Sequence, residues 1–230
     1  MELLLLHALP LDGSMWANQM DLLPNRMIAP TLYTFGDTIE KWAAEALRFT
    51  TSDRLIVVGC SVGGSCALEV AMVAPERVAA LILIGTKAAH RPNPAFCDSA
   101  LDLLNKSGVD TAWATYWEPL FSKGADPAVV DSARKTALGQ FQQDVSRGVT
   151  VFHSRPSRDQ FAAEWPKPMV VVTGEDDVAP GVATSAAMAA SAPHGRLHVI
   201  PSCGHYVPLE KPKALNAILN NVIDELVDDS

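Results

Sequence analysis

The chain has 230 residues, of which 48% are hydrophobic, and its formal net charge is -8 at pH 7. This length is enough for one large α/β domain with a substantial core. The negative charge gives no electrostatic basis for binding nucleic acid or an anionic membrane surface, so we expect neither partner. No apolar run is long enough to span a bilayer, and the start of the chain lacks the basic region of a signal peptide. The sequence therefore predicts a cytoplasmic protein.

Short apolar runs alternate with segments of helical periodicity along most of the chain. The runs are rich in Val, Ile and Leu without alternating polar residues, which is typical of strands buried on both faces. They cover residues 3–6, 55–58, 78–84, 169–172 and 197–200. Helical patterns follow at 62–74 and 212–227. This order predicts an α/β fold with a doubly wound, mostly parallel sheet.

One long segment, residues 86–167, contains no convincing strand and exceeds an ordinary crossover connection. Helical patches at 94–105, 110–121 and 127–145 lie within it. We interpret this segment as a helical cap inserted into a core made of residues 1–85 and 168–230. Core and cap together would form a single structural domain.

A serine motif lies between a predicted buried strand and a predicted helix. Residues 59–63, Gly-Cys-Ser-Val-Gly, satisfy the pattern G-x-S-x-G. Such a turn holds the serine hydroxyl at the carboxyl end of the sheet, where open α/β folds bind ligands. A serine that merely caps the following helix would explain Ser61 but not a glycine on each side. We therefore predict Ser61 as a nucleophile.

A serine nucleophile needs a general base, and the base needs an acid that orients it. Of the six histidines, only His205 follows a late strand in a loop before the last helix. Glu175, Asp176 and Asp177 follow the strand at 169–172, and position alone does not choose among them. The four cysteines have neither a CxxC pair nor metal-ligand spacing, so we expect small apolar fillers and no metal site.

Together these segments resemble the α/β-hydrolase superfamily, in its small serine esterase and enol-lactonase-like branch, over nearly all of the chain except the cap. The matching segments, in the family's own order, are LLLLHALPLDGSMW, GCSVGG, GEDD and CGHYVPLEKP. Because many members begin with a hairpin that is missing here, the resemblance implies a trimmed sheet of about six strands. Family spacing from Gly174 selects Asp177 as the acid, whereas counting back from Pro180 would favour Asp176.

The resemblance also implies an oxyanion hole made by the backbone N–H groups of Leu9 and Val62. Ala8 stands where the family usually has glycine, which restricts the turn near Leu9. His7 resembles a residue that braces this loop and is not a base.

The substrate pocket is predicted less directly. Its candidates are Trp113, Trp117, Val178 and Tyr206. The two tryptophans could line an acyl pocket or simply hold the cap helices together, and their helical spacing does not distinguish these roles.

The resulting hypothesis is hydrolysis of a small carboxylic ester or thioester by Ser61, His205 and Asp177 through an acyl-enzyme, with no metal or organic cofactor. An enol-lactonase or a carbon–carbon bond hydrolase would use the same triad. A lyase similar to the hydroxynitrile lyases, or a ligand receptor on the same fold, remain as alternatives. The sequence does not determine the oligomeric state, and a homodimer is one possibility.

Overall fold

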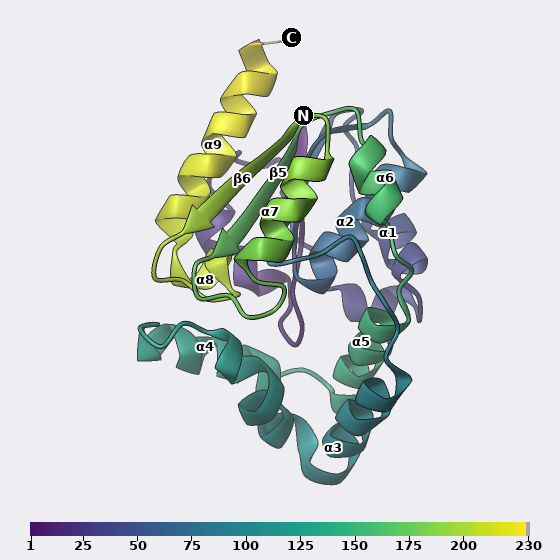
Figure 1. Cartoon of the computed structure of the whole chain (residues 1–230), viewed down its shortest axis with the longest axis vertical. Coiled ribbons are helices and arrows are strands. Elements are labelled where there is room, and N and C mark those ends of the chain that lie inside the picture. Colours follow the sequence, from purple (N-terminus) through teal and green to yellow (C-terminus); the bar gives the residue numbers. More distant parts are fainter. Residues whose placement is uncertain (229–230) are drawn as a thin grey trace.

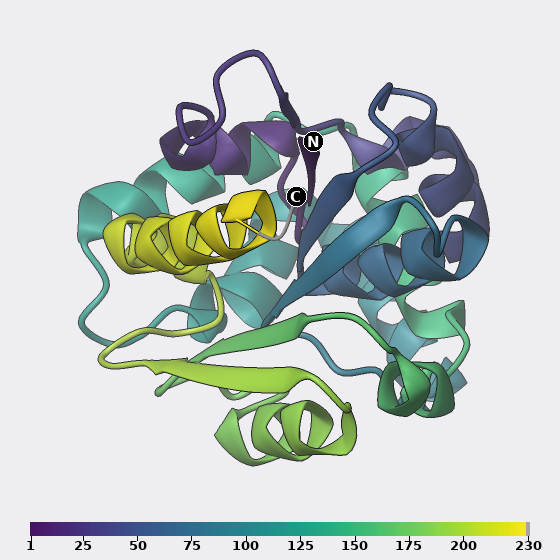
Figure 2. The ribbon, with the colours of Figure 1, turned by 90° about the horizontal axis from the view of Figure 1, so that it is seen from above.

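The computed structural model describes residues 1–228 and contains a six-stranded parallel sheet with helices on both faces (Figures 1 and 2). The strand order is β2-β1-β3-β4-β5-β6, and each neighbouring pair is parallel. The strands are β1 (Glu2–Leu6), β2 (Met27–Ile28), β3 (Leu55–Cys60), β4 (Val78–Ile84), β5 (Met169–Gly174) and β6 (Gly195–Ile200). The predicted doubly wound sheet of about six strands is confirmed.

The helices that flank the sheet are α1 (Ile39–Leu47), α2 (Val62–Val73), α6 (Asp159–Glu164), α7 (Val182–Ser191) and α9 (Pro212–Asp228). Helices α1, α2 and α7 cover one face, and α9 covers the other (Figure 2). Burial explains the unbroken apolar runs, because every residue of β3 and β5 is buried. Each fully buried Leu, Val or Ile side chain contributes about 1.5–3 kcal/mol to the stability of this core. No helix within residues 1–228 is long and apolar enough to cross a membrane.

The remaining α-helices lie beyond the carboxyl ends of the strands (Figure 1). They are α3 (Pro94–Ala112), α4 (Pro127–Leu138), α5 (Gln142–Ser154) and the short α8 (Val207–Glu210). The patch predicted as one helix at 127–145 is two helices, because α4 ends at Leu138, with Gly139 as its C-cap, and α5 begins at Gln142. Helix α6, inside the range predicted as cap, instead packs against α7. The division of the chain at 86 and 167 stays a prediction.

An ion pair joins the segment before α6 to the core helix α2. The Arg158 guanidinium donates to both oxygens of Glu69, at 2.6 and 3.0 Å, and the Glu69 side chain is almost fully buried. The Arg158 backbone N–H also donates to Ala88 O at 2.9 Å. Two segments far apart in the chain are thereby held together beside the sheet.

The loop after β1 is fixed by a buried histidine. His7 is fully buried, and its Nε2 accepts a hydrogen bond from the Leu32 N–H at 2.9 Å. The Nδ1 atom lies 3.1 Å from Ala8 O, so the neutral ring with its proton on Nδ1 satisfies both partners. Burial lowers the pKa of His7 to about 4.

The protein should therefore lose stability as the pH falls from 6.5 towards 4. The unfolded chain binds a proton at His7 near pH 6.5, whereas the folded chain does so only near 4. The shift corresponds to about 3 kcal/mol, present above pH 6.5 and lost progressively below it. Urea unfolding across this range should show a smaller pH slope for His7→Gln, whose amide oxygen can still accept from Leu32.

His194→Gln is the matched control, because His194 lies on the surface. Its slope should equal that of the unchanged protein. Equal slopes for all three proteins would show that His7 does not carry the effect.

Candidate functional site

Ser61 occupies a tight turn between β3 and α2. Its backbone has φ 56° and ψ -118°, and its N–H donates to Ile84 O at 2.8 Å. A Cβ at Gly59 would lie 2.2 Å from Gly63 O, and one at Gly63 would lie 2.1 Å from Leu6 O. The motif therefore needs both glycines for steric reasons. The Ser61 side chain makes no capping hydrogen bond to α2, so helix capping does not explain this serine.

The loop after β6 brings His205 against the carboxylate of Asp177, which follows β5. His205 Nδ1 lies 3.1 Å from each of the Asp177 carboxylate oxygens, and both side chains are buried. Asp177 Oδ1 also accepts from the Ala179 N–H at 2.8 Å. Asp176, the other candidate, is exposed, and its backbone N–H donates to Cys203 O. The structure thus brings Asp177 and not Asp176 to the histidine.

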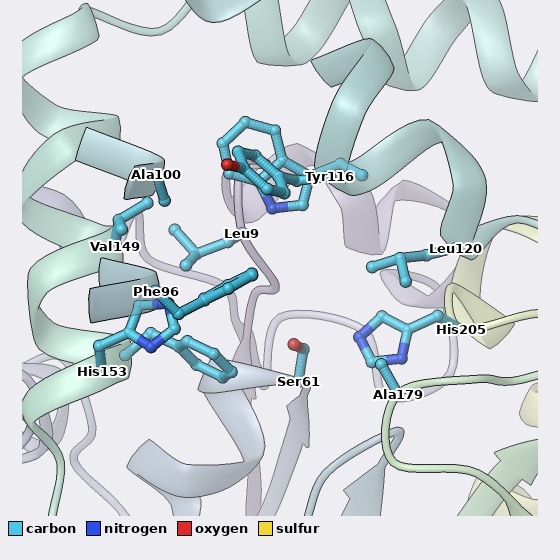
Figure 3. Close-up of a pocket in the computed structure, with 12 residues that line it drawn as sticks. Leu9, Ser61, Phe96, Ala100, Tyr116, Leu120, Val149, His153, Ala179 and His205 are labelled. Atoms are coloured by element: carbon cyan, nitrogen blue, oxygen red, sulfur yellow. The ribbon is translucent and has the colours of Figure 1, made fainter. Parts of the chain in front are cut away.

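Ser61 and His205 lie at the same end of a cavity under the cap helices (Figure 3). Since Nδ1 faces Asp177, the ring directs Nε2 away from that carboxylate. The structure contains no hydrogen bond between Ser61 Oγ and His205. Contacts of this kind are often long in an unliganded site and shorten when a substrate binds.

Two backbone donors at this edge of the sheet are unpaired. Within residues 1–228, nothing accepts a hydrogen bond from the N–H of Leu9 or of Val62. Val62 begins α2, and the first N–H groups of a helix have no partner inside the helix. The Tyr206 hydroxyl donates to Leu9 O at 3.1 Å and so fixes the loop that carries the first donor. Such free donors can bind a negatively charged oxygen.

The cavity has a volume of about 240 Å³ and is mostly apolar. Besides Ser61, His205 and Leu9, its walls come from the cap and from the loop after β5. These wall residues are Phe96, Ala100, Tyr116, Trp117, Leu120, Val149, Phe152, His153 and Ala179. Figure 3 shows Phe96, Ala100 and Val149 across the cavity from His205. The cavity can hold an apolar group beside the serine hydroxyl.

Of the four residues predicted to line the pocket, only Trp117 does so. Trp113 is fully buried within the cap, where its indole N–H donates to Glu118 Oε2 at 2.8 Å. Val178 points outward and is 74% exposed. Tyr206 is fully buried beneath the Leu9 loop, which its hydroxyl contacts. Trp113 and Tyr206 are thus packed in the interior and Val178 faces solvent, so none of the three lines the cavity.

Gly85, at the end of β4, is a site residue that the sequence reasoning missed. Its φ is 53°, and a Cβ there would lie 2.9 Å from His205 Nδ1 and 3.2 Å from Asp177 Oδ2. The pair can approach β4 only because this position has no side chain. A glycine directly after the predicted strand 78–84 was the available signal.

The cap and the histidine loop share hydrogen bonds. The His205 N–H donates to Leu120 O at 2.8 Å. The Glu210 carboxylate accepts from the Gly204 N–H, at 3.1 and 3.0 Å to its two oxygens, and from the Ser122 N–H at 3.1 Å. One carboxylate therefore joins the loop of His205 to the cap segment that follows Leu120.

The cysteines near the site are buried thiols. Cys60 and Cys203 are fully buried, and burial raises the pKa of each above its ordinary value. A raised pKa leaves little thiolate at neutral pH, so neither is activated as a nucleophile. No cluster of three potential metal ligands occurs among the residues that the structure describes.

Comparisons with known proteins agree on one family. The model of the alpha/beta hydrolase family matches residues 3–218. The pimeloyl-acyl-carrier-protein methyl ester esterase of Aromatoleum aromaticum is 26% identical, with 96% of this chain and 98% of that protein covered. A thermophilic esterase from Thermogutta terrifontis has a TM-score of 0.88 at 25% identity, with 98% and 90% covered. The enol-lactonase from Burkholderia xenovorans LB400 has a TM-score of 0.82 at 19% identity, with 98% and 90% covered.

We expect Gly85→Ala to separate His205 from Asp177. Alanine at a positive φ costs about 1–2 kcal/mol, and its methyl group would collide with the imidazole. The proton NMR signal of His205 Nδ1 should shift or broaden, and urea unfolding should give a loss of stability of that size. Gly124→Ala is the control, because nothing lies within 4 Å of a Cβ there. An unchanged imidazole signal in Gly85→Ala would contradict the steric role.

Proposed function

Because this chain belongs to the α/β-hydrolase family, we propose that it is a serine hydrolase that cleaves a small carboxylic ester or thioester through an acyl-enzyme. The main support is the pairing of His205 with Asp177 at 3.1 Å, at the end of the cavity that also contains Ser61. Ser61 has a positive φ, and within residues 1–228 its hydroxyl forms no hydrogen bond with the helix terminus or with another residue.

In the first step, Ser61 Oγ attacks the carbonyl carbon while His205 Nε2 takes the hydroxyl proton. Asp177 holds the Nδ1 proton, which keeps the ring in the right tautomer and stabilises its cation. The carbonyl oxygen becomes an oxyanion and accepts from the N–H groups of Leu9 and Val62. A lost oxyanion donor typically raises the barrier by about 3–4 kcal/mol.

The tetrahedral intermediate then collapses to an acyl-enzyme. His205 gives its proton to the leaving alcohol or thiol, whose bond to carbon breaks. In the second step, water attacks the acyl carbon while His205 accepts its proton. The free acid leaves, and the proton returns to Ser61 Oγ. No step of this sequence calls on a group outside the chain, the substrate and water.

The ester class is supported by the relatives and by the cavity. Two of the compared proteins are named as esterases, and the enol-lactonase shares the fold. An apolar cavity of about 240 Å³ suits a small alkyl or aryl group. A panel of p-nitrophenyl esters of graded chain length, lactones and thioesters tests the class directly. Turnover of lactones alone would replace the ester proposal by the lactonase alternative.

Substitution of the proposed triad should abolish ester turnover without unfolding the protein. Ser61→Ala, His205→Ala and Asp177→Asn should each lower kcat by about 10⁴-fold or more, because the groups act as a unit. Asp176→Asn is the matched control for Asp177→Asn and should keep kcat within about threefold, since Asp176 is exposed. Circular dichroism verifies the fold of each variant. A larger loss from Asp176→Asn than from Asp177→Asn would overturn the acid assignment.

Filling the cavity should shift the preference towards shorter substrates. Ala100 on α3 is almost fully buried and lines the cavity, so Ala100→Phe adds a ring there. We expect kcat/KM for acetate esters of long-chain alcohols, such as octyl acetate, to fall by about tenfold or more relative to methyl acetate. An equal effect on all chain lengths would show that this cavity does not hold the variable group.

A further inference from the structure

A second, smaller cavity adjoins Ser61. Its volume is about 130 Å³, and it shares Ser61, Phe152 and Ala179 with the first cavity. Its other lining residues are Gly85, Thr86, Lys87, Arg155 and Pro180. The two cavities therefore meet at Ser61 but differ in chemistry, because only the second is lined by a lysine and an arginine.

Arg155 is a buried cation without a counter-charge. It directly follows α5 and is only 4% exposed. Its guanidinium donates through Nη1 to Phe152 O, and its central carbon lies 3.9 Å from the centre of the Phe152 ring. Within residues 1–228, no carboxylate forms an ion pair with Arg155. The buried carboxylate of Glu69 is already bound by Arg158.

Burial of this kind is energetically unfavourable. Desolvation lowers the pKa of Arg155 to about 10, which still leaves the guanidinium charged at pH 7. A guanidinium has five N–H donors, and Phe152 O accepts from only one nitrogen. A buried charge normally has a partner that compensates its desolvation. Arg155 lines the second cavity, which is large enough for a small anionic group.

The surroundings reinforce the positive charge. Lys87 is exposed and lines the same cavity. Burial lowers the pKa of His90 and of His153, that of His153 to about 4, and the nearby Arg155 adds to both shifts. Both rings are neutral at pH 7, so they add no repulsion. A chain with a net charge of -8 thus carries a local positive pocket beside its candidate nucleophile.

We propose that the cavity of Arg155 and Lys87 binds a carboxylate of the substrate. This inference rests on the proposed function of Ser61 as nucleophile. With the scissile carbonyl at Ser61, an apolar group on one side would enter the larger cavity, and a short arm ending in a carboxylate would enter the smaller one. The preferred substrates are then esters that carry a free carboxylate, such as half-esters of small dicarboxylic acids. Guanidinium groups suit this task because they bind carboxylates through two parallel hydrogen bonds.

A purely structural role for Arg155 predicts something different. Its bond to Phe152 O satisfies a carbonyl in the last turn of α5, as basic residues at helix ends often do. In that case, its substitution would alter stability and would affect charged and neutral substrates equally. Comparison of two esters that differ only in one charge separates the two roles.

The unchanged protein gives the first test. The mono-p-nitrophenyl ester of succinic acid should have a kcat/KM about 10- to 100-fold above that of its methyl-capped, uncharged analogue. The preference should lie mainly in KM and should weaken as salt is added. Equal values, or a preference for the uncharged ester, would overturn the inference while leaving ester hydrolysis intact.

Substitutions of the basic residues give the second test. Arg155→Gln should remove the preference, so that the ratio of kcat/KM for the charged ester to kcat/KM for the uncharged ester falls to about one. Arg155→Lys should restore part of the preference, because it keeps the charge. Lys87→Gln, at an exposed position, should also reduce the preference. This variant provides the test if the Arg155 variants do not fold. Arg91→Gln, which removes an exposed arginine outside both cavities, should behave as the unchanged protein.

Calorimetry with succinate separates a failure of this inference from a failure of the proposed function. Ser61→Ala should still bind succinate, and the double variant with Arg155→Gln should not. Succinate binding without turnover of any ester would overturn the hydrolase proposal alone. Ester turnover without succinate binding to Ser61→Ala would overturn the carboxylate pocket alone.

Discussion

The constraint on which this site depends is steric: the turn from β3 into α2 has no space for a side chain two residues before or two residues after Ser61. At Gly59 and Gly63 the backbone approaches the following turn of helix and the end of β1 too closely for even a methyl group. The compact turn places Ser61 at the carboxyl edge of the sheet. The loops after β5 and β6 and the helices of the cap converge on the same edge.

A third glycine, Gly85, is equally important for the geometry of the site. Gly85 lets the imidazole of His205 and the carboxylate of Asp177 pack directly against the end of β4. The distance between the imidazole and the carboxylate is thus set by the backbone at the ends of three strands, β4, β5 and β6. Such preorganisation is what makes polar groups effective in a buried site.

Much of the core could be predicted from the sequence because strands buried on both faces produce unbroken apolar runs. The motif around Ser61 was equally clear, since two glycines at that spacing have one steric explanation. Position alone did not distinguish Asp177 from its neighbours; family spacing chose it, and the structure places that carboxylate against His205.

The cap could not be predicted to the same depth. A helical period shows which face of a helix is buried, but it does not show which part of the interior each side chain on that face contacts. For this reason Trp113 and Trp117, four positions apart, could not be told apart, although only the second reaches the cavity. Arg155 gave no signal at all, because no local sequence pattern encodes the burial of a basic residue that directly follows a helix.

The hydrogen bonds of Glu210 have a mechanical consequence. Its carboxylate bridges the backbone before His205 and the cap backbone at Ser122, while the His205 N–H is itself bound to the cap at Leu120. A displacement of residues 120–122 from the sheet would pull directly on the imidazole. Residues 120–122 therefore cannot move without displacing His205. Any widening of the cavity that preserves the alignment of His205 must come from α3 and α5 on the opposite wall.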